Sequence, residues 1–124
     1  MKPLYILKGE VVHGKALGRT VGRPTANLKV DEGYELPPSG VYATIGIVDG
    51  KRRQAVTNVG KRPSVDDEKN ITVETFFLDL HEDLYGKRLE LEFLGFIRPT
   101  KKFADLQEVS AQIQKDIEVA YSIF

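Results

Sequence analysis

Residues 41–59 decide the fold, and they read VYATIGIVDGKRRQAVTNV. The first part, Val41–Val48, is rich in apolar and β-branched residues and predicts a strand. The next two residues, Asp49 and Gly50, tolerate positive φ at low cost and predict a tight hairpin turn. Arg52–Val59 then predicts the returning strand, so an antiparallel hairpin lies near the centre of the chain.

Four segments outside this hairpin also predict strands, namely Leu4–Val12, Thr25–Val30, Ile71–Leu80 and Arg88–Ile97. Ile71–Leu80 is largely apolar on both alternating faces, which is more burial than an exposed edge strand requires. Because no helical segment separates successive strands, we do not expect a parallel sheet. Closure removes exposed sheet edges, so the sequence predicts an all-β dominated fold, a small antiparallel barrel that is closed or nearly closed.

The end of the chain follows a helical period instead. Its apolar residues recur every three or four positions, at Leu106, Val109, Ile113, Ile117 and Ala120. Asp105 suits the N-cap, and Glu108 lies where the reciprocal capping partner is expected. We therefore expect a helix over about residues 104–121, with one face packed on the barrel.

Length and composition limit the possible classes of protein. The 124 residues suffice for one domain, expected over residues 1–124. The 18 basic and 18 acidic residues give zero net charge, which weighs against a nucleic-acid partner. The absence of cysteine excludes disulfides and thiolate chemistry. No apolar run reaches the ~18 residues of a membrane span or resembles a signal peptide, so we expect a cytoplasmic protein without a membrane partner.

A glycine-rich segment over residues 14–28 reads GKALGRTVGRPTANL and carries most of the functional information. Glycines let backbone N–H groups approach a ligand closely, and the neighbouring cations suit a phosphate. The segment is neither a Walker A motif nor a dinucleotide-binding fingerprint, because the lysine spacing and the following helix are missing. The predicted nucleotide-binding residues are Gly14, Lys15, Gly18, Arg19, Gly22, Pro24, Thr25 and Asn27. A long glycine-rich hairpin without a ligand is the alternative interpretation.

Thr25 and Asn27 form a candidate metal site within this segment. They are two residues apart on a predicted strand, so their side chains lie on the same side. A hydroxyl and an amide oxygen on one face can contact one phosphate or one metal ion, and hard oxygen ligands of this kind suit Mg²⁺. We expect both side chains to face inward.

Glu74 is the candidate catalytic residue, because it is a carboxylate among apolar residues in the segment Thr72–Leu78. A partly desolvated carboxylate has a raised pKa and can serve as a general base. The alternative is a glutamate on the solvent-facing side of a strand. By their pattern alone, Asn58 and Arg98 are ordinary residues at strand ends.

Further motifs are spread along the whole chain. They are GEVVHG at 9–14, GVYA at 40–43, NVGKRP at 58–63, VET at 73–75, LDL at 78–80, DLYG at 83–86, FLGFIR at 93–98 and KF at 102–103. Together with the Pro-Thr-Ala-Asn segment, these motifs resemble the flavokinase (riboflavin kinase) family. The likeness is to the kinase half of the bacterial bifunctional riboflavin kinase/FAD synthetase, and it covers nearly the whole chain.

The resemblance implies a six-stranded antiparallel Greek-key barrel with a C-terminal helix. It also implies transfer of the ATP γ-phosphoryl group to the riboflavin 5′-hydroxyl, which gives FMN and ADP. In this scheme Thr25 and Asn27 would hold Mg²⁺ and phosphate oxygens, and Glu74 would act as the base. The loop at residues 14–23 would close over ATP. The residues bordering the flavin would be Asn58 and Arg98.

The chain departs from the family pattern in three respects. Phe76 stands where the family often has histidine, and Pro99, Thr100 and Lys101 follow Arg98 where an acidic residue is common. The bifunctional enzyme also carries an N-terminal adenylyltransferase domain that this sequence lacks. We therefore expect either a single-function kinase or an excised domain, in both cases without FAD synthesis.

Two other classes compete with the kinase. One is a flavin- or nucleotide-binding barrel without catalysis, and the other is a barrel that binds RNA. The joint presence of Thr25, Asn27 and Glu74 favours the kinase, because a pure binder needs no base beside a metal site. The zero net charge weighs against the RNA-binding barrel.

Overall fold

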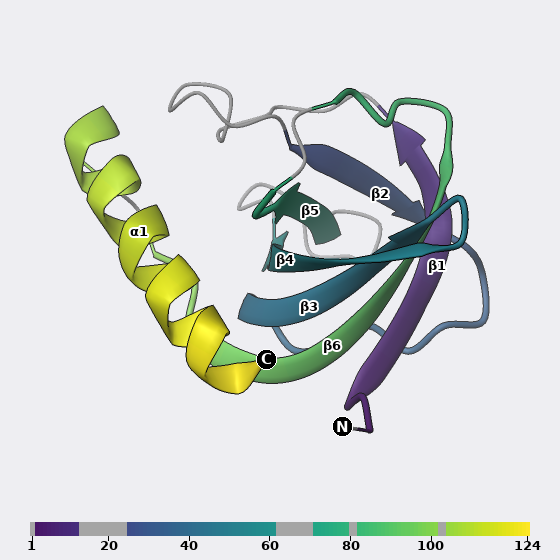
Figure 1. The fold of residues 1–124 in the computed structure, drawn as a ribbon, viewed down its shortest axis with the longest axis horizontal. Helices are drawn as coiled ribbons and strands as arrows, with labels where there is room; N and C mark the ends of the chain where they lie inside the picture. Colours follow the sequence, from purple (N-terminus) through teal and green to yellow (C-terminus); the bar gives the residue numbers. More distant parts are fainter. Residues whose placement is uncertain (1, 13–24, 62–70, 80–81, 102–103) are drawn as a thin grey trace.

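The computed structural model describes residues 2–12, 25–61, 71–79, 82–101 and 104–124. The elements of this described part are β1 (Tyr5–Val12), β2 (Ala26–Val30), β3 (Gly40–Val48), β4 (Lys51–Lys61), β5 (Ile71–Phe77), β6 (Arg88–Arg98) and α1 (Leu106–Ile123). The strands form a closed antiparallel barrel in the order β1-β2-β5-β4-β3-β6. Since β2 lies beside β5, strands β2 to β5 make a Greek key. Helix α1 lies outside the barrel, along its flank (Figure 1).

The central hairpin forms where the sequence predicts it. Asp49 and Gly50 both adopt positive φ, 52° and 77°, and connect β3 to β4. Val48 and Lys51 are the first ladder pair after the turn. The two-residue connection fits the right-handed twist of the flanking strands, which explains why this local signal was sufficient.

The strands differ from the predicted bounds by one to three residues at some ends. β4 continues to Lys61 because Ile71 of β5 still pairs with it there. β5 ends at Phe77 rather than Leu80, since its last ladder partner in β4 is Ala55. These ends depend on pairing with other strands, which no local pattern reports.

The barrel interior is almost entirely apolar. Its fully buried side chains include Leu7, Leu91 and Phe93, each 0% exposed. The interior also holds three threonine hydroxyls, from Thr44, Thr57 and Thr75. The hydroxyl oxygens of the first two are 2.9 Å apart, and those of the last two are 2.7 Å apart. These hydrogen bonds remove most of the cost of burying polar groups in the interior.

A second apolar cluster lies on the outer face of the barrel, beneath α1. Strand residues Val41 and Phe76 contribute to it, and Ile117 and Ala120 contribute from the helix. The helix contacts β6, β3 and β4. On the outer side of β5, Phe76 is buried in this cluster and Thr72 and Glu74 are half-buried, so this strand has more burial than an exposed edge strand, as its sequence predicts.

The start of α1 is capped as predicted. Asp105 accepts a hydrogen bond from the backbone N–H of Glu108, with an N···O distance of 2.9 Å. The Glu108 carboxylate accepts from the N–H of Ala104 at 2.8 Å, one residue before the position expected for a reciprocal pair. The helix ends at Ile123, two residues beyond the predicted end. None of the helical residues that the structure describes forms a segment able to span a membrane.

Candidate active site

The barrel ladder brings four predicted site residues into one row. Asn27 of β2 pairs with Glu74 of β5, and Glu74 pairs with Asn58 of β4. Asn58 pairs in turn with Val41 of β3, which pairs with Arg98 of β6. Residues 71 positions apart in the chain therefore share one line across five neighbouring strands. We call this line the site row: Asn27, Glu74, Asn58, Val41 and Arg98.

The site row faces the outside of the barrel, and its members from Glu74 to Arg98 lie on the side nearest α1. Asn27 alternates with Ala26 and Leu28, which both belong to the interior core. Glu74 likewise lies between Val73 and Thr75, which are buried on the interior side. Since successive strand residues point to opposite faces, Asn27 and Glu74 point outward. The prediction that the metal ligands face inward is therefore wrong, because the interior is already filled by apolar side chains.

A narrow slot of about 90 Å³ lies between this face and α1. Its polar lining comes from Thr25, Asn58, Glu74, Arg98 and Asp116. Its apolar lining comes from Val41, Val56, Phe76, Val109 and Ile113. The slot thus joins the polar groups of the site row to an apolar wall made by strands and helix together, which is the usual composition of a small-molecule site.

Glu74 is half-buried and is the second member of the row, between Asn27 and Asn58. Its ladder neighbours on both sides are amide residues, Asn27 and Asn58. Phe76 follows it on the same face and also lines the slot. The partial burial expected from the sequence is confirmed, and both faces of β5 are covered for different reasons, one by the core and one by the helix.

The hydroxyl of Thr25 is the least satisfied polar group of the site. The oxygen is buried and has no hydrogen-bond partner among the described residues. An unpaired buried hydroxyl costs about 1–3 kcal/mol, so such groups call for an explanation. A ligand or a cation that contacts this hydroxyl at the slot would be such an explanation. The described residues contain no cluster of three His, Cys, Asp or Glu side chains that could hold a metal ion. The hydroxyl and amide oxygens of Thr25 and Asn27 belong to the class of hard donors that Mg²⁺ accepts.

Arg98 is held by a carboxylate that sequence reasoning missed. Its Nε donates to Oδ1 of Asp116 at 2.7 Å, and its Nη2 donates to Oδ2 at 2.9 Å. Gln112 also donates to Asp116 Oδ1, at 3.0 Å, and Asp116 is only 2% exposed. A signal was available, because Asp116 lies three residues after Ile113 and therefore inside the apolar stripe of the helix.

Several predicted nucleotide-binding residues lie outside the described residues. They are Gly14, Lys15, Gly18, Arg19, Gly22 and Pro24. The glycine-rich phosphate site therefore stays a prediction.

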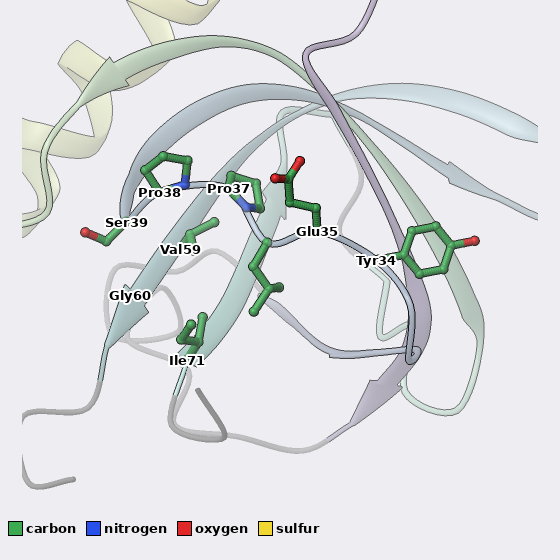
Figure 2. Close-up of a pocket in the computed structure, with 9 residues that line it drawn as sticks. Tyr34, Glu35, Pro37, Pro38, Ser39, Val59, Gly60 and Ile71 are labelled. Atoms are coloured by element: carbon green, nitrogen blue, oxygen red, sulfur yellow. The ribbon is translucent and has the colours of Figure 1, made fainter. Parts of the chain in front are cut away.

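A larger cavity of about 520 Å³ lies under the segment that joins β2 to β3 (Figure 2). Tyr34, Glu35 and the pair Pro37-Pro38 come from that segment, and Val59 comes from β4. None of the predicted site residues that the structure describes lines it. The chemistry-bearing side chains gather instead at the smaller slot, so size alone does not locate the candidate site.

The fold and the site together define a class of small barrel proteins. A riboflavin kinase from Trypanosoma brucei superposes with a TM-score of 0.66 at 27% identity, over 98% of this chain and 80% of that one. A crystal structure described as a macrolide-efflux protein from Streptococcus pneumoniae gives a TM-score of 0.86 at 32% identity, over 96% of this chain and 38% of that one.

The family model described as Flavokinase, riboflavin kinase, matches residues 1–124. The bifunctional riboflavin kinase/FMN adenylyltransferase of Listeria monocytogenes is 36% identical over 120 residues, which cover 97% of this chain and 38% of the relative. The chain therefore belongs to the flavokinase family. It spans about two fifths of the length of this curated relative.

Proposed function

We propose that this chain transfers the γ-phosphoryl group of ATP to the 5′-hydroxyl of riboflavin, giving FMN and ADP. The observation that carries the proposal is the site row, in which Glu74 lies between Asn27 and Asn58 beside the unpartnered hydroxyl of Thr25. Membership of the flavokinase family supports the choice of substrates.

Glu74 is the base of the proposed reaction. The 5′-oxygen of riboflavin attacks the γ-phosphorus, and the bond from that phosphorus to the bridging oxygen breaks. ADP leaves with the bonding electron pair, and the carboxylate of Glu74 accepts the hydroxyl proton. The half-buried position of Glu74 favours this role, because partial desolvation makes a carboxylate a better proton acceptor.

Thr25 and Asn27 are the residues that would hold Mg²⁺ and phosphate oxygens. Their hydroxyl and amide oxygens suit that ion, and the buried hydroxyl of Thr25 has no described partner that would compete for it. When bound with ATP, Mg²⁺ would neutralise charge on the transferring phosphate. The two side chains lie close to Glu74, because Asn27 is its ladder neighbour and Thr25 lines the same slot.

The other end of the site row suits the flavin ring. Val41 and Phe76 on the strands face Ile113 on the helix, and they form an apolar wall for a flat aromatic ligand. Asn58 and Arg98 border this wall with polar groups. In the proposed arrangement the ring would lie near α1 and the reacting hydroxyl near Glu74.

The test is a product assay with the full chain, riboflavin, ATP and MgCl₂. We expect FMN by liquid chromatography and ADP release that depends on riboflavin. A non-catalytic flavin- or nucleotide-binding barrel would instead bind riboflavin or ATP and form no FMN, which would contradict the proposal. We expect no FAD when the chain meets FMN and ATP. A cytoplasmic location and a place in a larger bifunctional protein are parts of the same proposal.

A further inference from the structure

The contact between Arg98 and Asp116 is the most deeply buried ion pair among the described residues. The side chains are 19% and 3% exposed. By contrast, the chemically similar pair of Arg52 and Glu92, which also makes two hydrogen bonds, is 58% and 16% exposed. A buried ion pair pays a large desolvation cost and is weak evidence of a contribution to stability. The presence of this ion pair at the slot therefore points to a role other than attachment of α1 to the barrel.

The surroundings of Asp116 fix its position closely. Both carboxylate oxygens accept from Arg98, and Gln112 one turn earlier on α1 donates to Oδ1. On the other side, Arg98 Nη1 donates to the carbonyl of Pro99 at 3.0 Å. A planar guanidinium that donates two parallel hydrogen bonds to one carboxylate and a third to the carbonyl of the residue after its own strand has one orientation.

We infer that Asp116 is a positioning residue for flavin binding: it orients the guanidinium of Arg98 along the wall of the slot and sets the spacing between β6 and α1. The inference rests on the proposed function, because it takes the slot as the flavin site. Arg98 and Asp116 both line that slot together with Asn58 and Glu74. The slot is only about 90 Å³, and both strands and α1 line it, so the position of α1 sets its width.

The location of the pair predicts which step depends on it. Arg98 is the last member of the site row, with Val41 and Asn58 between it and Glu74. Asp116 therefore acts on the ring end of the slot and not on the end where the proposed phosphoryl transfer occurs. Its loss should weaken riboflavin binding and leave the apparent KM for ATP unchanged.

The experiment measures riboflavin affinity by flavin fluorescence, with ADP and MgCl₂ present, so that the readout needs no turnover. Asp116→Asn should raise the Kd for riboflavin by about 10-fold, the value of one charge-assisted hydrogen bond. Glu92→Gln is the matched control, since it breaks a two-bond arginine pair outside the slot and should leave the Kd unchanged. Circular dichroism verifies that each variant is folded.

A double variant, Arg98→Met with Asp116→Leu, separates positioning from simple attachment of the helix. Apolar replacement of a buried ion pair often keeps or raises stability. If the pair positions Arg98 for the ligand, the Kd stays raised although α1 remains attached. A return to the Kd of the unmodified chain would overturn the inference, and so would an unchanged Kd in Asp116→Asn.

The outcomes also separate this inference from the proposed function. Riboflavin binding without FMN formation by the unmodified chain contradicts the proposed function. In that case the ratio of the riboflavin Kd of Asp116→Asn to that of the unmodified chain still tests the inference. FMN formation with equal Kd values for the unmodified chain and Asp116→Asn contradicts the inference alone. Absence of riboflavin binding by the unmodified chain contradicts both.

Discussion

The interior of the barrel and its outer face beneath α1 both contain apolar clusters, but they differ in the hydrogen bonding of their few polar groups. Inside, the hydroxyls of Thr44, Thr57 and Thr75 hydrogen-bond to one another. Outside, the buried hydroxyl of Thr25 has no partner among the described residues, and the carboxylate of Glu74 is half-buried. The hydroxyls of the interior thus satisfy one another, while the outer face contains a hydroxyl, that of Thr25, that a ligand can satisfy.

This difference separates stability from function. The interior is enclosed by strands on all sides and holds the largest of the fully buried side chains, such as Phe93, Leu7 and Leu91. The outer face is covered by a single helix, so its wall can adjust without opening the barrel (Figure 1). Substitutions inside should therefore act on folding, and substitutions outside should act on binding and turnover.

The largest expected effect is on folding, from Phe93→Ala in the interior. Phe93 is 0% exposed, and its ring packs edge-on against Tyr42 with centroids 5.2 Å apart. We expect a loss of about 3–5 kcal/mol in the free energy of unfolding, because the cavity cannot collapse in a closed barrel. Urea unfolding followed by circular dichroism measures it. A loss below about 1 kcal/mol would show that the interior is not the main source of stability.

The same kind of truncation beneath the helix should cost less and affect binding. Ile117 is 7% exposed in the outer cluster. We expect Ile117→Ala to lower the free energy of unfolding by about 2 kcal/mol, the low end for such a change, because α1 can move toward the barrel. It should also weaken riboflavin binding, which Phe93→Ala does not do in the fraction that remains folded. Equal losses in the free energy of unfolding for Phe93→Ala and Ile117→Ala would contradict the proposed difference between the interior and the outer face.

Thr25→Val tests the incomplete polar group directly. The hydroxyl has no described partner, so its replacement by a methyl should keep or slightly raise the melting temperature. FMN formation should fall by about 10-fold or more, equivalent to about 1.4 kcal/mol. Thr72→Val is the control, since Thr72 donates to the carbonyl of Gly60 and does not line the slot. Full activity of Thr25→Val would remove this residue from the site.

The smallest effect is expected at the exposed pair of Arg52 and Glu92. The hydrogen bond from Arg52 lowers the pKa of Glu92 in the folded state. The pair therefore stabilises the fold above the unfolded pKa of about 4.3, and the contribution is lost as the pH falls through the lower folded value. Glu92→Gln should lower the melting temperature by about a degree or two at pH 7. The deficit should shrink in melts below about pH 4, and a deficit that grows there would contradict the assignment.

Local signals in the sequence predicted much of the fold. Asp49-Gly50 marked the hairpin, and Asp105 marked the start of α1, because turn and cap chemistry depend on a few adjacent residues. The closed antiparallel barrel was also predicted, from the absence of helices between strands. The neighbours in the sheet were not predicted by pattern, since the pairing of β2 with β5 is a long-range contact.

The candidate site was predicted in its residues but not in its arrangement. Glu74 stood out as a carboxylate in an apolar strand, and Asn27 as an amide in another. They face outward because Ala26, Leu28, Val73 and Thr75 occupy the interior side of the same strands, and the apolar residues on both faces of β5 left that choice open. Asp116 was missed because it was hidden among the other polar residues of the helix, although it lies within the apolar stripe.

The central claim is that the outer face holds a phosphoryl-transfer site whose base is Glu74. The most direct measurement compares FMN formation by Glu74→Gln and Glu90→Gln, two substitutions of half-buried glutamates on strands. Glu90 contacts Lys8 on another part of the barrel and does not line the slot. We predict a fall of about 10²–10⁴-fold in kcat for Glu74→Gln, and near-normal turnover for Glu90→Gln. Near-normal turnover in a folded Glu74→Gln variant would contradict the account.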